Sequence, residues 1–128
     1  MTSQLATVVI DSTDPTAIAG FWKEVLGWVV LEEDDTGVSL GAPGTRMPGL
    51  DILRVPEAKE GKNRLHLDLR ADGLTTAAEL ERLLALGARR CDVGQAQDAT
   101  WVVLADPEGN EFCLLQRSVQ ELGVQSEQ

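Results

Sequence analysis

The amino-acid sequence predicts an α+β fold built from two βαβββ modules in tandem. Both halves of the 128-residue chain show the same order of patterns: a strand, a helix that ends in Leu-Gly, and three further strands. The two Leu-Gly pairs, Leu26-Gly27 and Leu86-Gly87, lie 60 residues apart. A repeated layout at this spacing indicates an internal duplication. A chance α+β arrangement of short elements is the alternative, and the pattern alone leaves it open.

The first half begins with a β-branched run, residues 5–11, which is typical of a strand. Asp14-Pro15 then predicts the start of a helix, because Asp is a favoured N-cap and Pro suits the first helical position. Apolar residues at helical spacing follow, and Gly27 is expected to end this helix; they are Ile18, Phe21, Trp22, Val25 and Leu26. Three strands are then expected, at residues 28–33, 37–40 and 50–55.

The second half repeats this layout. Leu65, Leu67 and Leu69 alternate with polar residues, which predicts a half-buried strand over 64–70 whose leucines face a helix. Thr76 followed by Glu79 matches a capping box, so a helix is expected over 76–86; its apolar stripe comprises Ala77, Leu80, Leu83 and Leu84. Three more strands are expected, at 89–93, 100–105 and 111–116, with a turn over 106–110.

The chain is expected to be a single domain over residues 1–128, because its length leaves no room for a second full core. The first module is expected to span about 5–56 and the second about 64–117. The polar segment 118–128 is expected to be a frayed tail.

The charge balance is strongly acidic, with 11 basic against 21 acidic side chains and a formal net charge of −10. Such a chain repels phosphate backbones and anionic lipid, so nucleic-acid and membrane-surface binding are disfavoured. Two cysteines, Cys91 and Cys113, are too few for a disulfide framework, and no signal peptide or membrane span is recognisable. A reduced, cytoplasmic setting is therefore expected.

Three segments together carry a family resemblance: Asp14-Pro15 leading to Leu26-Gly27-Trp28, then residues 62–69, then Asp106-Pro-Glu-Gly-Asn-Glu-Phe-Cys113. In order and spacing they resemble glyoxalase-like domains of the vicinal oxygen chelate superfamily, which includes glyoxalases, bleomycin-resistance proteins and dioxygenases. The resemblance spans residues 5–116. It implies paired βαβββ modules whose curved mixed sheets surround a cavity, with the helices outside.

In metal-dependent members, the resemblance implies four inward-facing ligands for a divalent cation. The matching positions here are Thr7, Asp51 (or the neighbouring Leu53), His66 and Cys113. Thr is a poor metal ligand, although a His, Asp and Cys trio formed by Asp51, His66 and Cys113 could hold Zn²⁺. Because a buried cysteine is more often an apolar filler, we expect no metal site and no cofactor.

The single histidine, His66, is a candidate acid–base group because Asp68 lies two residues away on the same strand face. We therefore take His66 and Asp68 as candidate catalytic residues, with an ordinary solvated strand face as the alternative. A nucleophilic Cys113 would require the fold to bring it to His66. The candidate ligand-binding residues are Thr7, Asp51, His66, Arg70, Trp101 and Cys113.

Two functions follow from the resemblance. The favoured one is a small-molecule-binding protein of the sequestration or resistance type, without the usual divalent-metal site. The alternative is a lyase or isomerase of the glyoxalase superfamily that uses His66 with neighbouring acids, with or without an unusual metal. A fold that supports many chemistries does not identify the reaction or the ligand. The resemblance also implies a homodimer.

Overall fold

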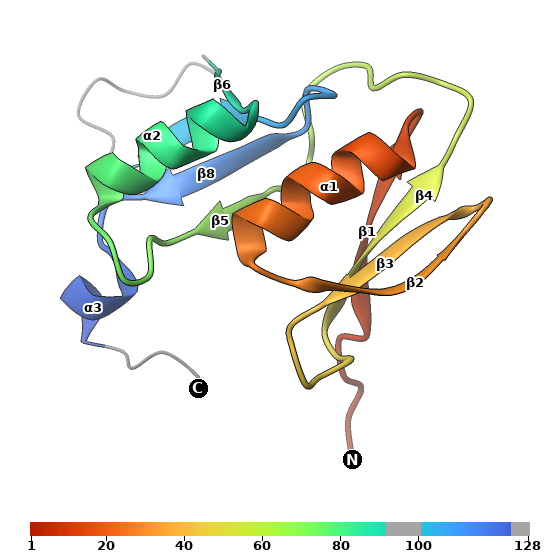
Figure 1. Ribbon diagram of the computed structural model, residues 1–128, viewed down its shortest axis with the longest axis horizontal. Helices are drawn as coiled ribbons and strands as arrows, with labels where there is room; N and C mark the ends of the chain where they lie inside the picture. The colour runs from red at the N-terminus through yellow and green to blue at the C-terminus, as the bar shows by residue number, and fades with distance from the viewer. Residues whose placement is uncertain (92–100, 124–128) are drawn as a thin grey trace. The chain divides into compact units, whose positions relative to one another are not determined.

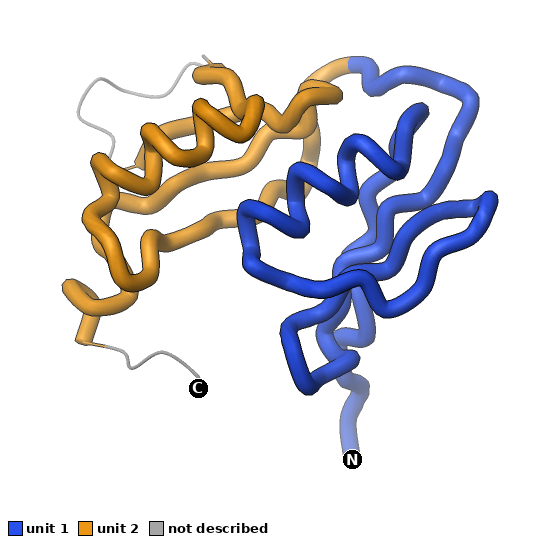
Figure 2. Tube along the Cα trace, in the orientation of Figure 1, with its two compact units in different colours: residues 1–60 blue, residues 61–128 orange. Residues whose placement is uncertain are grey.

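The computed structural model describes residues 1–91 and 101–123. The chain divides into two compact units, unit 1 (Met1–Glu60) and unit 2 (Gly61–Gln128), shown in two colours in Figure 2. Each unit contains one four-stranded mixed sheet and a long helix, as the tandem α+β prediction requires. No helix within the described residues is both long enough and apolar enough to cross a membrane.

Unit 1 has the predicted βαβββ order (Figure 1). Its sheet runs in the order β1-β4-β3-β2, with β1 parallel to β4 and the other neighbours antiparallel. The elements are β1 (Thr7–Ser12), α1 (Pro15–Leu26), β2 (Val29–Asp34), β3 (Gly37–Gly41) and β4 (Gly49–Arg54).

Helix α1 forms where local signals predict it. The Asp14 side chain accepts a hydrogen bond from the backbone N–H of Ala17 (3.3 Å), and Gly27 ends the helix with a φ of 67°. Its apolar face packs on β1, β3 and β4, where alternate residues point to the helix. Leu40 and Ile52 are fully buried there, whereas Val9 and Leu53 lie on the opposite face and are 47% and 40% exposed.

Unit 2 repeats the order with shorter strands (Figure 1). Its sheet runs in the order β5-β8-β7-β6, with β5 parallel to β8 and the remaining pairs antiparallel. The elements are β5 (Leu67–Leu69), α2 (Thr76–Leu86), β6 (Arg89–Arg90), β7 (Trp101–Ala105), β8 (Glu111–Leu115) and α3 (Val119–Leu122). The parts of the predicted strands at 92, 93 and 100 lie outside the described residues.

Strand β5 is shorter than the predicted strand 64–70, and Leu65 is 88% exposed instead of facing a helix. The ladder explains this difference. Leu67 pairs with Phe112, so Leu65 would have to pair with Asn110, which lies in the turn before β8. Buried Asp106 fixes that turn by accepting hydrogen bonds from the backbone N–H groups of Glu108 and Asn110, each at 2.9 Å.

Two local predictions for unit 2 are wrong. Thr75, not Thr76, is the N-cap of α2 and accepts from the backbone N–H of Ala78 (3.1 Å), because the Thr76 hydroxyl donates to the Gln116 carbonyl (2.8 Å). Glu79 forms no capping box and instead binds Arg82 at 2.6 Å from a buried position. Of the predicted stripe, Leu83 is fully buried and Leu80 half-buried, whereas Ala77 and Leu84 are exposed.

The segment predicted as a frayed tail contains the short helix α3. Its N-cap Ser118 is buried and forms a capping box with Glu121, in which each side chain accepts from the other residue's backbone N–H. Hydrogen bonds from the backbone N–H and the side chain of Ser118 lower the pKa of the Glu121 carboxyl. Ordered structure therefore continues past residue 117, to Gly123 among the described residues.

The revised cap of α2 gives a direct test. Thr75→Ala is expected to lower the free energy of unfolding by about 1 kcal/mol, because the backbone N–H of Ala78 loses its side-chain acceptor. Urea unfolding followed by circular dichroism measures the change. A loss in Thr75→Gly as large as that in Thr75→Ala would contradict the cap assignment, because glycine replaces a capping threonine at a cost of only a few tenths of a kcal/mol.

Candidate functional site

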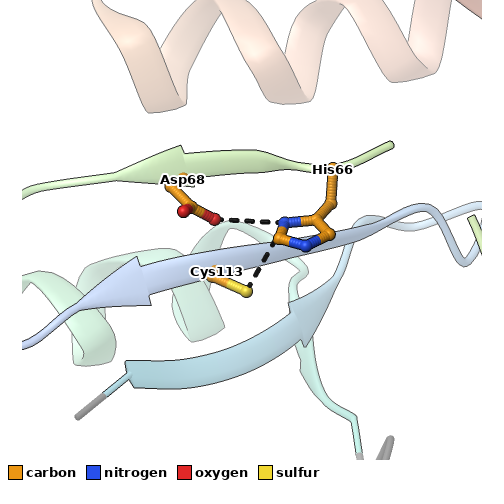
Figure 3. Close-up of side chains that lie close together, drawn as sticks. All are labelled: His66, Asp68 and Cys113. Carbon is orange, nitrogen blue, oxygen red and sulfur yellow. Dashed lines mark hydrogen bonds and ion pairs between the residues drawn. The ribbon is translucent and has the colours of Figure 1, made fainter. Parts of the chain in front are cut away.

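The sheet of unit 2 brings three chemically reactive side chains together, which we call the His66–Asp68–Cys113 cluster (Figure 3). Asp68 on β5 and Cys113 on β8 are directly opposite each other in the parallel ladder, so both side chains project from the same face of the sheet. His66 immediately precedes β5, two residues from Asp68, and its ring turns back over the same face.

Both contacts of the imidazole use Nδ1. This nitrogen lies 3.1 Å from Asp68 Oδ1 and 3.8 Å from Cys113 Sγ. The His66 and Asp68 side chains are 42% and 46% exposed, whereas Cys113 is buried with 5% exposure. In this cluster the thiol of Cys113 is therefore buried, whereas solvent or a ligand can reach the polar side chains of His66 and Asp68.

Asp68 determines how the ring is protonated. An ionised carboxylate can only accept hydrogen bonds, so the Nδ1 that contacts it must carry the proton. In the neutral ring, Nε2 is then a bare hydrogen-bond acceptor. Within the described part of the chain, Asp68 and Cys113 are the hydrogen-bonding partners of this ring, so Nε2 remains available to a ligand.

The thiol is held in its protonated form. Burial, which is the largest cause, together with the negative charge of Asp68 and a hydrogen bond to it, raises the pKa of Cys113 to about 11, whereas the charge of Lys62 acts in the opposite sense. A thiol with this pKa carries almost no thiolate at neutral pH. The structure thus brings Cys113 to His66, but the environment of the thiol does not activate it as a nucleophile.

The remaining candidates from the sequence lie outside the cluster. Thr7 on β1 and Asp51 on β4 belong to unit 1, where the Thr7 hydroxyl donates to the Val8 carbonyl (3.3 Å) and Asp51 pairs with Val9 and Ser39. Arg70 follows β5 and donates from Nη1 to the Arg117 carbonyl (2.9 Å). This bond joins the residue that follows β5 to the segment that follows β8.

Trp101 begins β7 and is 39% exposed. Through its pairing with Leu115 it shares the sheet face of Cys113 and Asp68. Two strand spacings and two residues separate it from Asp68, which places their Cα atoms roughly 12 Å apart. Trp101 can therefore form one wall of a site on this face.

The sequence did not reveal how two charged residues near the cluster, Lys62 and Glu111, influence it. Lys62 is the cation that acts on the Cys113 thiol, and Glu111 accepts a hydrogen bond from the backbone N–H of Asn63 (2.7 Å). The second bond ties the chain just before His66 to the start of β8. The charge of Lys62 in the segment before β5 and that of Glu111 at the start of β8 were the only available signals.

The four metal-ligand positions implied by the family resemblance do not fit the usual donor set. Thr7 offers a hydroxyl that already donates to the main chain, and Cys113 offers a protonated, buried thiol. Among residues 1–91 and 101–123, the group of potential ligands that does gather is His66, Asp68 and Cys113. Asp68, which the sequence suggested for proton transfer, takes the place expected of Asp51.

Solved structures support the fold assignment. The chain is similar to the fosfomycin resistance protein FosX from Mesorhizobium loti (14% identity, TM-score 0.69), covering 95% of this chain and 98% of that one. It is also similar to a glyoxalase/bleomycin resistance protein/dioxygenase family enzyme from Burkholderia phytofirmans (22%, 0.65), covering 88% and 97%. A third similar structure is TnmS3, an antibiotic-binding protein from a Streptomyces species (19%, 0.58), covering 91% and 98%.

No curated protein matches the chain significantly. The similar structures fall below 25% identity, so they show the fold and not the activity. The family model for the glyoxalase-like domain matches residues 7–115, which include every strand that the structure describes in either unit. This chain therefore belongs to the glyoxalase-like domain family.

Proposed function

We propose that this protein binds a small organic molecule on the sheet face of unit 2 and does so without the family's four-position divalent-metal site. It would act by sequestration, as resistance-type members of the superfamily do. The observation that carries the proposal is the half-exposed His66 ring, whose Nδ1 is held by Asp68 and whose Nε2 is left as an acceptor.

The geometry indicates the chemistry of the ligand. A bare Nε2 accepts a hydrogen bond, so the ligand must offer a donor such as a hydroxyl group. The ionised Asp68 and the net charge of −10 disfavour anions. Trp101 offers an aromatic surface on the same sheet face. A neutral, hydroxyl-bearing aromatic compound satisfies all three conditions, and one structural neighbour is named as an antibiotic-binding protein.

Catalysis is the second candidate, and the Asp68–His66 contact favours it. A carboxylate that fixes the ring through Nδ1 leaves Nε2 poised to take a proton from a bound substrate, as a general base in a lyase or isomerase would. In this proposal His66 is the catalytic base and Asp68 the residue that orients it. The protonated Cys113 thiol has no nucleophilic part.

Binding can be tested by calorimetry in the presence of a chelator, with hydroxyaromatic antibiotics, their O-methyl ethers and 2-oxo aldehydes as probes. We expect a hydroxyaromatic compound to bind, and His66→Ala and Asp68→Asn to weaken its binding by about 10-fold. Asp35→Asn, in the turn between β2 and β3, is the matched control and should leave affinity unchanged. Equal affinity for a hydroxyl compound and its methyl ether would contradict the proposed donor contact.

Chromatography of the same mixtures separates the two candidate functions. Recovery of unchanged ligand supports sequestration, whereas formation of product that stops in His66→Ala supports catalysis.

We also propose a cytoplasmic homodimer. The exposed Val9 and Leu53 on one sheet face of unit 1 are the kind of apolar surface that a partner covers. Light scattering that shows only a 13.8 kDa species would contradict the dimer.

A further inference from the structure

The His66–Asp68–Cys113 cluster offers one imidazole nitrogen, one carboxylate oxygen and one sulfur, all within 4.8 Å of one another. We infer that these three side chains form a binding site for a thiophilic divalent cation, with Zn²⁺ as the physiological candidate. This inference does not rest on the proposed small-molecule function. The site shares His66 and Cys113 with the four-position set implied by the family resemblance. It differs from that set because all three donors belong to unit 2 and because Asp68 holds none of the four positions.

The spacing of the donors matches a tetrahedral zinc site. Zn–N and Zn–O bonds of about 2.1 Å and a Zn–S bond of about 2.3 Å place neighbouring ligand atoms about 3.4–3.6 Å apart at tetrahedral angles. The observed separations from Nδ1 are 3.1 Å to Asp68 Oδ1 and 3.8 Å to Cys113 Sγ. Both separations lie within a few tenths of an ångström of the tetrahedral values, and all three donor atoms lie within 4.8 Å of one another.

The sheet preorganises two of the three donors. Asp68 and Cys113 are opposite residues of the β5–β8 ladder, so backbone hydrogen bonding sets their separation before any ion arrives. His66 lies just outside the ladder, where its ring can adjust. The carboxylate of Glu111 holds the backbone of Asn63, which limits how far the segment before His66 can move away.

Donor chemistry selects the class of cation. Imidazole, thiolate and carboxylate are the ligands of zinc, whereas Mg²⁺ and Ca²⁺ require oxygen ligands in larger number. Because the His66 and Asp68 side chains are half-exposed above a buried Cys113 thiol, the fourth coordination position of the ion would be open to water or to a ligand oxygen. Binding replaces the thiol proton, which leaves to solvent, and moves the ring proton from Nδ1 to Nε2, so one proton is released per ion.

The inference can be tested with untagged, chelator-treated full-length protein, using Zn²⁺ for calorimetry and Co²⁺ as a spectroscopic probe. We expect one ion per chain, a sulfur-to-cobalt charge-transfer band, and no binding of Mg²⁺. Cys113→Ser should abolish the band. His66→Ala and Asp68→Asn should each weaken Zn²⁺ binding by about 100-fold, since each loses one of three ligand bonds.

Two matched controls separate this site from adventitious binding. Cys91→Ser removes the other free thiol, and Asp51→Asn removes the carboxylate that the sequence placed in the trio; both should bind Zn²⁺ and Co²⁺ like the parent protein. Circular dichroism verifies that each variant is folded. Absence of binding, a charge-transfer band lost in Cys91→Ser but kept in Cys113→Ser, or equal affinity in all variants would overturn the inference. Because small-molecule binding is measured with chelator present, either proposal can fail while the other stands.

Discussion

Phe112→Ala is expected to lower the free energy of unfolding of unit 2 by about 3–5 kcal/mol, the range for deleting a fully buried aromatic ring. Phe112 has no exposed surface and lies on β8, one of the two inner strands of its sheet, where it pairs with Leu67 on β5 and Leu104 on β7. The cavity left by the ring would lie among elements that cannot close over it without distorting the ladder. Since Cys113 follows Phe112 directly, the variant should also disturb the cluster.

Urea denaturation followed by far-ultraviolet circular dichroism measures this loss. Phe112→Leu keeps most of the apolar volume and is the matched control, with an expected loss of about 1 kcal/mol. A loss below about 1 kcal/mol in Phe112→Ala would mean that the β8 side chain is not the centre of the unit 2 core.

Gly37→Ala is expected to destabilise unit 1 by about 3 kcal/mol or more. A Cβ at this position would overlap the carbonyl oxygen of Ile52 and lie 3.1 Å from the Cα of Leu53, so backbone would have to move. Gly37 pairs with Leu53 at the start of β3, and a shift there opens the β3–β4 ladder. Overpacking of side chains usually costs about 1–3 kcal/mol, and a clash with main chain is expected at or above the top of that range because the backbone cannot rotate away as a side chain can.

Gly20→Ala is the comparison, and it is expected to raise the stability of unit 1 where Gly37→Ala lowers it. Gly20 lies within α1, and a Cβ there meets nothing within 4 Å. Alanine should therefore stabilise the helix by about 0.5–1 kcal/mol through its higher helix propensity. Fluorescence of the buried Trp22 reports unfolding of unit 1 in both variants. Destabilisation of similar size in the two variants would contradict the strand register assigned to Gly37.

The elements that the sequence predicted correctly are those with local signals. Asp14, Pro15 and Gly27 define α1 within a single stretch of chain, and the structure places its boundaries there. The errors arose where residues far away in the sequence determine the local structure. The leucine alternation extends β5 back to residue 64, but the turn that ends at Asn110 leaves Leu65 without a partner strand. The Thr76 hydroxyl is engaged by Gln116, forty residues away, which no local capping rule includes.

The candidate site, too, could be predicted only where its residues are close in the sequence. His66 and Asp68 are two residues apart, so their shared face could be predicted from strand geometry. Cys113 lies 47 residues further along than His66 and joins them only through the parallel register of β5 and β8. The sequence offered Asp51 as the carboxylate of a trio with His66 and Cys113, and Asp68 only as a residue for proton transfer. Only the ladder, which sets Asp68 opposite Cys113, distinguishes them.

The protonation state of the His66 ring tests the central claim most directly. The chain has one histidine, so a long-range ¹H–¹⁵N correlation spectrum contains a single, unambiguous imidazole. In metal-free protein, at a pH where the ring is neutral, we predict a protonated Nδ1 and a bare Nε2, because Asp68 holds the Nδ1 proton. Asp68→Asn, whose amide can also donate, is expected to weaken this preference. A ring protonated at Nε2 in the parent protein would contradict the account.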